Sequence, residues 1–160
     1  MAHLLREVGL DFVGAAPVRH VFARETAAPP EAVYSALAED VAGWTQWYGA
    51  VTLARPLDGG ARREIRLMGG TRFEETVLAA ERPEVYAYRV DLTNAPGSRA
   101  IVEEWRLAPA GAGTRVQWTI AVDGTAPFRT SVRLARPGLA RAFRGAVTSL
   151  DRRLAAASAS

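Results

Sequence analysis

The chain has 160 residues, a net charge of +3 and no cysteine, which fits one domain with a real core and excludes disulfides and thiolate metal sites. All 20 basic residues are arginines, and outside the C-terminal segment they alternate with acids, so the charge pattern does not predict a nucleic-acid partner. Arg6, Glu7 and Asp11 interrupt what would be the apolar core of a signal peptide, and no apolar run could span a membrane. We therefore expect a soluble, cytoplasmic protein.

The N-terminal part of the chain predicts an extension followed by a strand. Residues 1–16 are interpreted as the extension, with the capacity for a short helix, and residues 17–157 as a single domain. The stretch 18–26, VRHVFARET, alternates in the manner of a strand and places Val18, His20 and Phe22 on one face.

Two short helices are predicted next. Residues 28–40, APPEAVYSALAED, begin with prolines that suit a first helical turn, and Asp40 is placed to cap a second helix. That second helix carries the aromatic cluster Trp44, Trp47 and Tyr48. We expect one of the two tryptophans to anchor the helix in the core, and the other to form a cavity wall or gate with Tyr48.

Residues 50–124 have the pattern of an antiparallel sheet. Strand-length runs occupy 50–56, 61–68, 72–80, 84–93, 98–109 and 114–124, and turn residues separate them. The short links predict that neighbouring strands are antiparallel. In the fourth run Tyr86 and Tyr88 share a face opposite Ala87 and Arg89, so we expect one covered and one solvated face.

The C-terminal region is predicted to be the helix that covers the sheet. The helical pattern runs over 126–157, with an interruption at Pro137 and Gly138. An apolar stripe follows, made of Leu139, Phe143, Val147, Leu150 and Leu154. The arginines beside it allow contact with an anionic membrane surface, but a helix docked on the sheet is the favoured interpretation because the sheet needs the same stripe.

The order of these elements and several sequence motifs within them resemble the SRPBCC (START-like, helix-grip) superfamily, and within it the polyketide cyclase/dehydrase-like branch. These motifs are APPEAVYSALAED with the following WTQW, then ERPEVYAYRV and GAGTRVQW. The resemblance covers about residues 18–155 and implies an α+β helix-grip fold. In that fold a curved, seven-stranded antiparallel sheet wraps around a long C-terminal helix, in the order β-α-α-β6-α, and encloses a deep cavity.

The resemblance leaves the function open between several classes. The leading hypothesis is binding of a small hydrophobic molecule, aromatic polyketide-like or lipid-like, without a metal or other cofactor. The first alternative is an enzyme, a polyketide aromatase/cyclase or dehydratase that uses Glu, Tyr and Arg groups in the cavity. A lipid carrier or a protein-interaction module is the other, and the sequence allows a monomer or a homodimer.

Aromatic side chains on inward strand faces are the candidate ligand-binding residues. They are Trp44, Trp47, Tyr48, Tyr86, Tyr88, Trp105, Trp118 and Phe143. Aromatic walls with a few polar groups are typical of ligand sites. The alternative is that these residues are ordinary core.

Two acids fall on apolar strand faces and are the candidate catalytic residues together with Tyr88. Glu75 shares the face of Phe73 and Val77, and Glu103 shares that of Trp105. A carboxyl in an apolar cavity loses hydration, so its pKa rises towards the range of a general acid or base. A β-bulge that turns the acid outward, or a pairing with arginine at the mouth of the cavity, are the competing interpretations.

The arginines and histidines give weaker signals. The resemblance implies an inward Arg that acts with a Tyr to position carbonyl oxygens, and no single one of Arg62, Arg63, Arg66 and Arg72 is assigned to that role. His3 and His20 are the only histidines, and no ligand spacing predicts a metal site. No nucleophile elbow, phosphate loop or dinucleotide motif is present, so catalysis stays an open question.

Overall fold

The computed structural model describes residues 1–160 and contains eight strands and several helices. The strands are β1 (His3–Leu4), β2 (Val18–Thr26), β3 (Val51–Leu57), β4 (Arg62–Leu67), β5 (Arg72–Glu81), β6 (Val85–Thr93), β7 (Ser98–Ala110) and β8 (Gly113–Gly124). The helices are α1 (Phe12–Ala15), α2 (Pro30–Tyr34), the π-helix η1 (Ser35–Glu39), the 3-10 helices η2 (Val41–Gln46) and η3 (Asp58–Gly60), α3 (Ala126–Leu134) and α4 (Arg136–Ser158). Each of the seven predicted strands is present, with bounds within one residue of the prediction.

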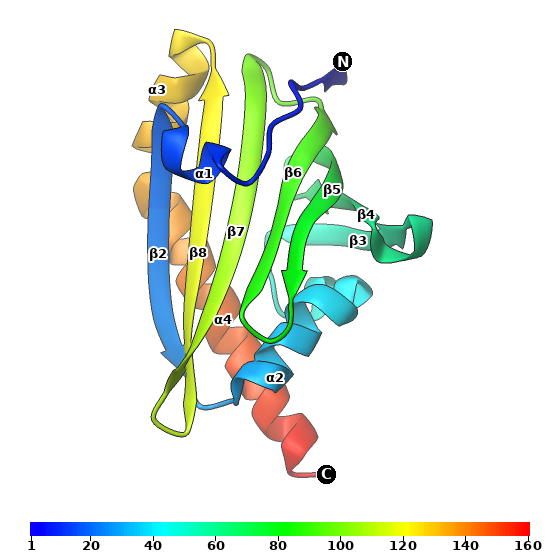
Figure 1. The fold of residues 1–160 in the computed structure, drawn as a ribbon, viewed down its shortest axis with the longest axis vertical. Helices are drawn as coiled ribbons and strands as arrows, with labels where there is room; N and C mark the ends of the chain where they lie inside the picture. The colour runs from blue at the N-terminus through cyan, green and yellow to red at the C-terminus, as the bar shows by residue number, and fades with distance from the viewer.

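The strands form one antiparallel sheet in the order β2-β8-β7-β6-β5-β4-β3. From β3 to β8, strands that are consecutive in the chain pair with each other. β2 pairs with β8 and so lies at one edge of the sheet. The long helix α4 runs across one face of this curved sheet (Figure 1). The predicted α+β helix-grip fold is thus confirmed, with an eighth strand in addition to the predicted seven.

The additional strand, β1, lies in the segment interpreted as an extension. The pairing of β6 with β7 ends at Arg89 opposite Val102, and the N-terminal segment bonds to both strands beyond that point. The amide of Leu5 donates to the carbonyl of Asp91, and that of Arg6 to the carbonyl of Arg99, each at 2.8 Å. Residues 3–6 therefore fill a gap in the sheet with backbone hydrogen bonds that the separated ends of β6 and β7 would otherwise lack.

The prediction of a solvated outer face is wrong over β7 and β8. Phe12 of α1 packs there with Ala100, Val102 and Ala121 in a buried cluster on the face opposite α4. Figure 1 shows α1 in front of these strands and α4 behind them. The outward residues of this part of the sheet are small and apolar, and they therefore need the cover that the N-terminal segment provides.

The helix that carries the aromatic cluster begins as predicted. The Asp40 side chain accepts a hydrogen bond from the backbone amide of Gly43 at 3.2 Å and so caps η2. A Cβ atom at Gly43 would overlap the Asp40 carboxylate, so a larger residue there would displace the capping side chain. The preceding predicted helix is present as α2 continued by η1.

The C-terminal helical region is broken, but at Ala135 rather than at Pro137 and Gly138. Pro137 lies in the first turn of α4, where its missing amide hydrogen leaves no intrahelical bond unmade. The predicted stripe is confirmed: Phe143, Val147 and Leu150 are buried, and Leu139 and Leu154 pack partly buried against the same core. No helix combines the length and hydropathy needed to cross a membrane.

Candidate functional site

A cavity of about 270 Å³ lies between the sheet and the helices α3 and α4. Most of its wall is apolar, with contributions from Ile65, Ile101 and Ile120 on the strands and from Phe128 and Leu139 on the helices. Four strand residues with charged or hydroxyl groups interrupt this wall, and they are Arg63, Glu75, Tyr88 and Glu103. An apolar hollow with a few polar groups is the usual form of a small-molecule site.

Strand register brings these four side chains together. Arg63 of β4 is directly opposite Glu75 of β5, and Tyr88 of β6 is directly opposite Glu103 of β7. The four strands are consecutive in the sheet, so the two pairs lie side by side on one face. An irregularity in the pairing of β5 with β6 falls between Glu74 and Glu75, yet Glu75 still points inward.

Hydrogen bonds connect the carboxyls to the aromatic wall. Arg63 Nε donates to Glu75 Oε2 in a pair whose side chains are both 2% exposed. Glu103 Oε2 accepts from the Tyr88 hydroxyl at 2.7 Å and from Trp118 Nε1 at 2.9 Å. Tyr88 in turn accepts from Trp105 Nε1 at 3.1 Å. Both acids are therefore held by donors, with Glu75 buried and Glu103 half-buried.

Burial changes the proton affinities of these acids. Burial raises the pKa of Glu75 to about 7, although Arg63 opposes the rise, and Glu103 adds to it. Burial also raises the pKa of Glu103, against the hydrogen bonds from Tyr88 and Trp118 that favour its ionised form. Burial opposes the charge of Arg63, but Glu75 and the tyrosines outweigh that effect, so its pKa is raised. The cluster is therefore a buried cation with two neighbouring carboxyls.

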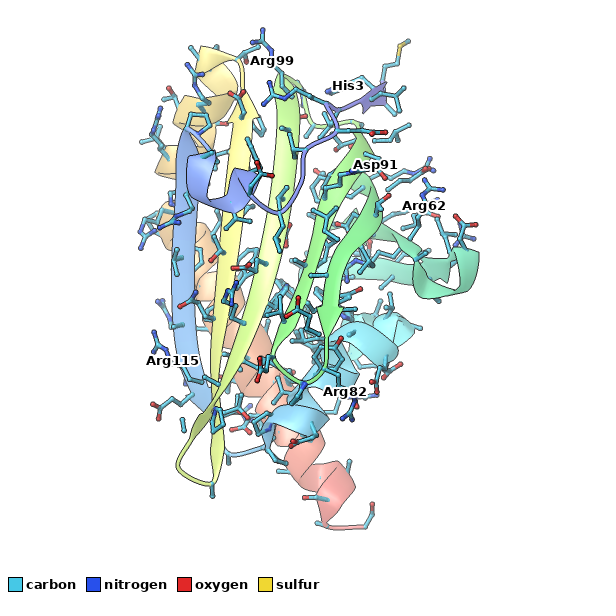
Figure 2. All side chains as sticks on the ribbon, in the orientation of Figure 1. His3, Arg62, Arg82, Asp91, Arg99 and Arg115 are labelled. Atoms are coloured by element: carbon cyan, nitrogen blue, oxygen red, sulfur yellow. The ribbon has the colours of Figure 1, made fainter.

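Among the candidate arginines, only Arg63 points inward. Its guanidinium lies 3.7 Å from the ring centre of Tyr88 and 4.4 Å from that of Trp44, in the geometry of cation–π contacts. Its Nη1 atom is buried and has no hydrogen-bond partner. Arg62, which Figure 2 shows at the periphery, bonds to Glu74.

The other two candidate arginines pair on the outer face. Arg66 and Arg72 form ion pairs with Glu64, at 2.9 and 3.5 Å. The sequence pattern alone did not separate Arg63 from these neighbours. The alternation of Arg63 with Ile65 and Leu67 was the signal that could have done so.

The predicted aromatic set divides into two groups. Trp44, Tyr48, Tyr88 and Trp118 line the cavity. Trp47, Tyr86, Trp105 and Phe143 do not line it; they are buried in the packed core behind this wall. Trp105 is an example of the second group. Its ring stacks on that of Trp118 and meets that of Trp44 edge-on, each with 5.7 Å between ring centres, so it supports these wall residues from behind.

The two tryptophans near the capped helix η2 take different positions. Trp44 faces the cavity and is also anchored, since its Nε1 donates to the carbonyl of Leu37 at 2.9 Å. Trp47 instead borders a groove of about 500 Å³ on the outside, against α4. Ala50 and Ala142 line both this groove and the cavity.

The helix α3 contributes wall residues that the sequence pattern did not reveal. Phe128 and Val132 of α3, and Ala135 at the break, line the cavity. No strand alternation marks such residues, because they belong to a helix whose position depends on the break. His20 is buried beside this helix, where its Nε2 lies 3.0 Å from the carbonyl of Val132 and its Nδ1 lies 3.1 Å from Arg136 Nη1. No three His, Asp or Glu side chains are grouped as metal ligands.

Comparison of sequences finds one family across almost the whole fold. A profile of the family described as "Polyketide cyclase / dehydrase and lipid transport" matches residues 18–155. An uncharacterised protein of Mycobacterium tuberculosis is 28% identical over 150 residues, which cover 91% of this chain and 89% of that protein.

Comparison of structures finds the same architecture. A protein of Thermus thermophilus superposes with a TM-score of 0.67 at 25% identity, over 88% of this chain and 99% of its own. A START superfamily protein from Mycobacterium smegmatis gives a TM-score of 0.65 at 16% identity, over 82% of this chain and 98% of its own. The second likeness concerns the fold alone.

Proposed function

Because the chain belongs to the polyketide cyclase / dehydrase and lipid transport family, we propose that it binds a small hydrophobic molecule in the cavity between its sheet and α4. The observation that carries the proposal is the aromatic-walled cavity of about 270 Å³ with four inward polar side chains. The aromatic residues that line this cavity are Trp44, Tyr48, Tyr88 and Trp118.

The volume of the cavity limits the size of the ligand. Sites for drug-sized molecules usually measure about 300–1,000 Å³, and an apolar cavity of about 150 Å³ holds one benzene molecule. A cavity of about 270 Å³ therefore suits a one- or two-ring aromatic compound or a short lipid-like fragment. Affinity would come from apolar burial, at about 25 cal/mol for each Å² removed from water.

Binding can be tested with one- and two-ring aromatic compounds. We expect them to raise the melting temperature of the protein and to quench its tryptophan fluorescence, because Trp44 and Trp118 are in the wall. Native mass spectrometry of the purified protein would show any molecule that is retained from the cell. The proposal fails if no compound of this set binds and the protein carries none.

A pair of variants on α3 would locate the site. Val132 lines the cavity, whereas Leu134 on the same helix is 77% exposed. Val132→Phe should fill part of the cavity and abolish binding, and Leu134→Phe should bind like the unaltered protein. Circular dichroism would confirm that both variants are folded, and equal binding by both would place the site elsewhere.

A second candidate function is proton transfer on a polyketide-like substrate, as in a cyclase or dehydratase. The observation that favours it is the pair of inward acids, Glu75 and Glu103, with the pKa of Glu75 raised by burial to about 7. A general base is most effective when its pKa is near the working pH. In this candidate mechanism Glu75 and Glu103 would move protons, and Tyr88 would hold Glu103 in position.

The two candidate functions differ in their response to conservative changes of the acids. Glu75→Gln and Glu103→Gln keep the shape of the cavity, so hydrophobic binding should persist. Conversion of a short synthetic poly-β-ketone should fall by about two orders of magnitude or more in either variant if the acids catalyse. Full turnover by both variants would exclude the catalytic role.

A further inference from the structure

Two polar side chains of the cavity wall keep an unpartnered oxygen that a ligand can reach. Glu103 Oε2 accepts from Tyr88 and Trp118, but Glu103 Oε1 has no hydrogen-bond partner within the protein. The Tyr48 hydroxyl has none either, and neither oxygen belongs to the enclosed side-chain atoms that lack a partner. Both residues line the cavity, so both oxygens have surface that is exposed to it.

The other charged or hydroxyl side chains of the wall are enclosed or already bonded. Arg63 and Glu75 bond to each other and are 2% and 1% exposed. Tyr88 is equally buried, and its hydroxyl is already both a donor and an acceptor within the protein. Tyr48 and the half-buried Glu103 are more exposed than any of these. A ligand therefore meets one free acceptor and one free donor.

The free acceptor and the free donor contact the same indole ring. The ring of Tyr48 meets that of Trp118 edge-on, with 6.5 Å between ring centres, and Trp118 Nε1 donates to Glu103 at 2.9 Å. Burial raises the pKa of Tyr48, and the negative charge of Glu103 adds to the rise, as expected for groups within electrostatic reach. The two groups therefore belong to one part of the cavity.

A hydroxyl matches this pair, because it can donate and accept at once. Its hydrogen can be donated to Glu103 Oε1 while its oxygen accepts from Tyr48. A ketone or an ether can use only Tyr48, and its lone pairs face those of Glu103. A carboxylate also meets the charge of Glu103 in a place where water screens it little.

We propose that Glu103 and Tyr48 form a subsite for a ligand hydroxyl, so that the cavity prefers one- or two-ring alcohols and phenols to ethers and ketones of the same skeleton. The proposal rests on the proposed function, since it names the ligand class of the same site. Glu103 is the specificity-determining residue, and Tyr88 and Trp118 position its carboxylate. A carbonyl oxygen held by an inward Arg and a Tyr, which the family resemblance implies, would give the opposite preference.

Three compounds separate this proposal from the function it rests on. Naphthalene has no oxygen, 2-methoxynaphthalene has an oxygen that only accepts, and 2-naphthol has one that also donates. Calorimetric titration at neutral pH should show 2-naphthol binding about tenfold more tightly than the ether, although the ether is the more hydrophobic compound. Naphthalene reports hydrophobic binding alone.

Glu103→Gln should abolish or reverse this preference. Tyr88 and Trp118 still donate, so the amide oxygen takes the place of Oε2 and the amide NH₂ group replaces the free acceptor. The ratio of the 2-naphthol affinity to that of the ether should fall at least tenfold, and naphthalene should still bind. Glu104→Gln is the matched control, because Glu104 bonds to Arg106 on the opposite face of β7, and it should keep the ratio.

Tyr48→Phe gives a second test that does not alter the acid. It removes the free donor and keeps the ring, so 2-naphthol should lose about threefold or more in affinity relative to naphthalene. Circular dichroism would show that each variant is folded. The affinities of the unaltered protein and of Tyr48→Phe decide the question even if Glu103→Gln does not fold.

The outcomes distinguish the proposal from the proposed function. If none of the three compounds binds, the proposed function fails together with the subsite. If naphthalene binds but the ether equals or exceeds 2-naphthol in affinity, the cavity binds hydrophobic molecules and the hydroxyl subsite is overturned. A preference for 2-naphthol that persists unchanged in Glu103→Gln and in Tyr48→Phe also overturns it.

Discussion

At the scale of the residue, Tyr88 links the core to the acids of the cavity. Its hydroxyl accepts from Trp105 and donates to Glu103, so one oxygen bonds to a buried indole and to a half-buried carboxyl. The inward position of Tyr88 was predictable from the alternation of its strand. Its partners were not, because Trp105 and Glu103 reach it only through the pairing of β6 with β7.

Tyr88→Phe should lower the free energy of unfolding by about 1–3 kcal/mol, because it leaves Trp105 Nε1 without an acceptor and removes a donor from Glu103. Urea denaturation followed by fluorescence would measure the loss. Tyr48→Phe is the matched control, since Tyr48 is also buried but its hydroxyl makes no hydrogen bond within the protein. Equal losses in the two variants would contradict the role given to Tyr88.

The Glu75 carboxyl should make stability fall as the pH rises. Its pKa goes from an ordinary value of 4.5 to about 7 on folding, because burial disfavours the ionised form. Between these values the folded protein binds more protons than the unfolded chain, so stability is lost as pH increases through this window. At about 1.4 kcal/mol per pKa unit the loss is about 3–4 kcal/mol. The groups that influence Glu75 are Arg63 on β4, Asp91 on β6 and Glu103 on β7.

Comparison with Glu75→Gln isolates this effect from other titrating groups. The stability of the unaltered protein minus that of the variant should decrease from about pH 4.5 to about pH 7 and then level off. Urea denaturation at a series of pH values would give both curves. Glu74→Gln, on the outer face of the same strand, serves as control and should not reproduce the decrease. A difference that stays constant with pH would contradict the assignment.

At the scale of the element, η2 shows how a local signal positions part of the cavity wall. Asp40 caps the helix, Gly43 leaves room for that carboxylate, and Trp44 then projects into the cavity. The cap and the helix were predicted from the sequence. Which tryptophan faces the cavity was not, because this depends on how η2 rests against β3 and α4.

Asp40→Ala should destabilise the protein by about 1 kcal/mol through loss of the cap. Asp40→Asn keeps an acceptor oxygen and should restore most of that loss. Arg153 lies 4.0 Å from Asp40, but an exposed pair of this kind contributes little. Chemical denaturation of both variants provides the measurement, and an Asn variant as unstable as the Ala variant would show that charge, not capping, matters.

At the scale of the whole molecule, α4 packs across the curved sheet and lines the cavity together with α3. Phe143 of α4 is 1% exposed and packs against Phe22, Trp105 and Trp118 from three different strands. The N-terminal segment covers the opposite face, with Phe12 against β7 and β8. The sheet is therefore packed on both faces at its centre.

Phe143→Ala should lower the free energy of unfolding by about 3–5 kcal/mol, because it removes a buried ring that joins the helix to the strands. Leu134→Ala in the neighbouring helix should change stability by less than about 0.5 kcal/mol, since Leu134 is 77% exposed. Urea denaturation of the two variants would test the contrast. Similar stabilities would mean that the contacts of Phe143 are not what holds α4 to the sheet.

The sequence by itself determined the seven long strands, the capped helix and the apolar stripe of α4, because each depends on residue periodicity or on a local cap. It also placed Glu75, Glu103 and Tyr88 on inward faces. Only the tertiary structure decided that Arg63 pairs with Glu75, that Trp44 rather than Trp47 faces the cavity, and that residues 3–6 add to the sheet. These features arise from register between strands and from packing between distant segments, and periodicity along one strand carries no information about either.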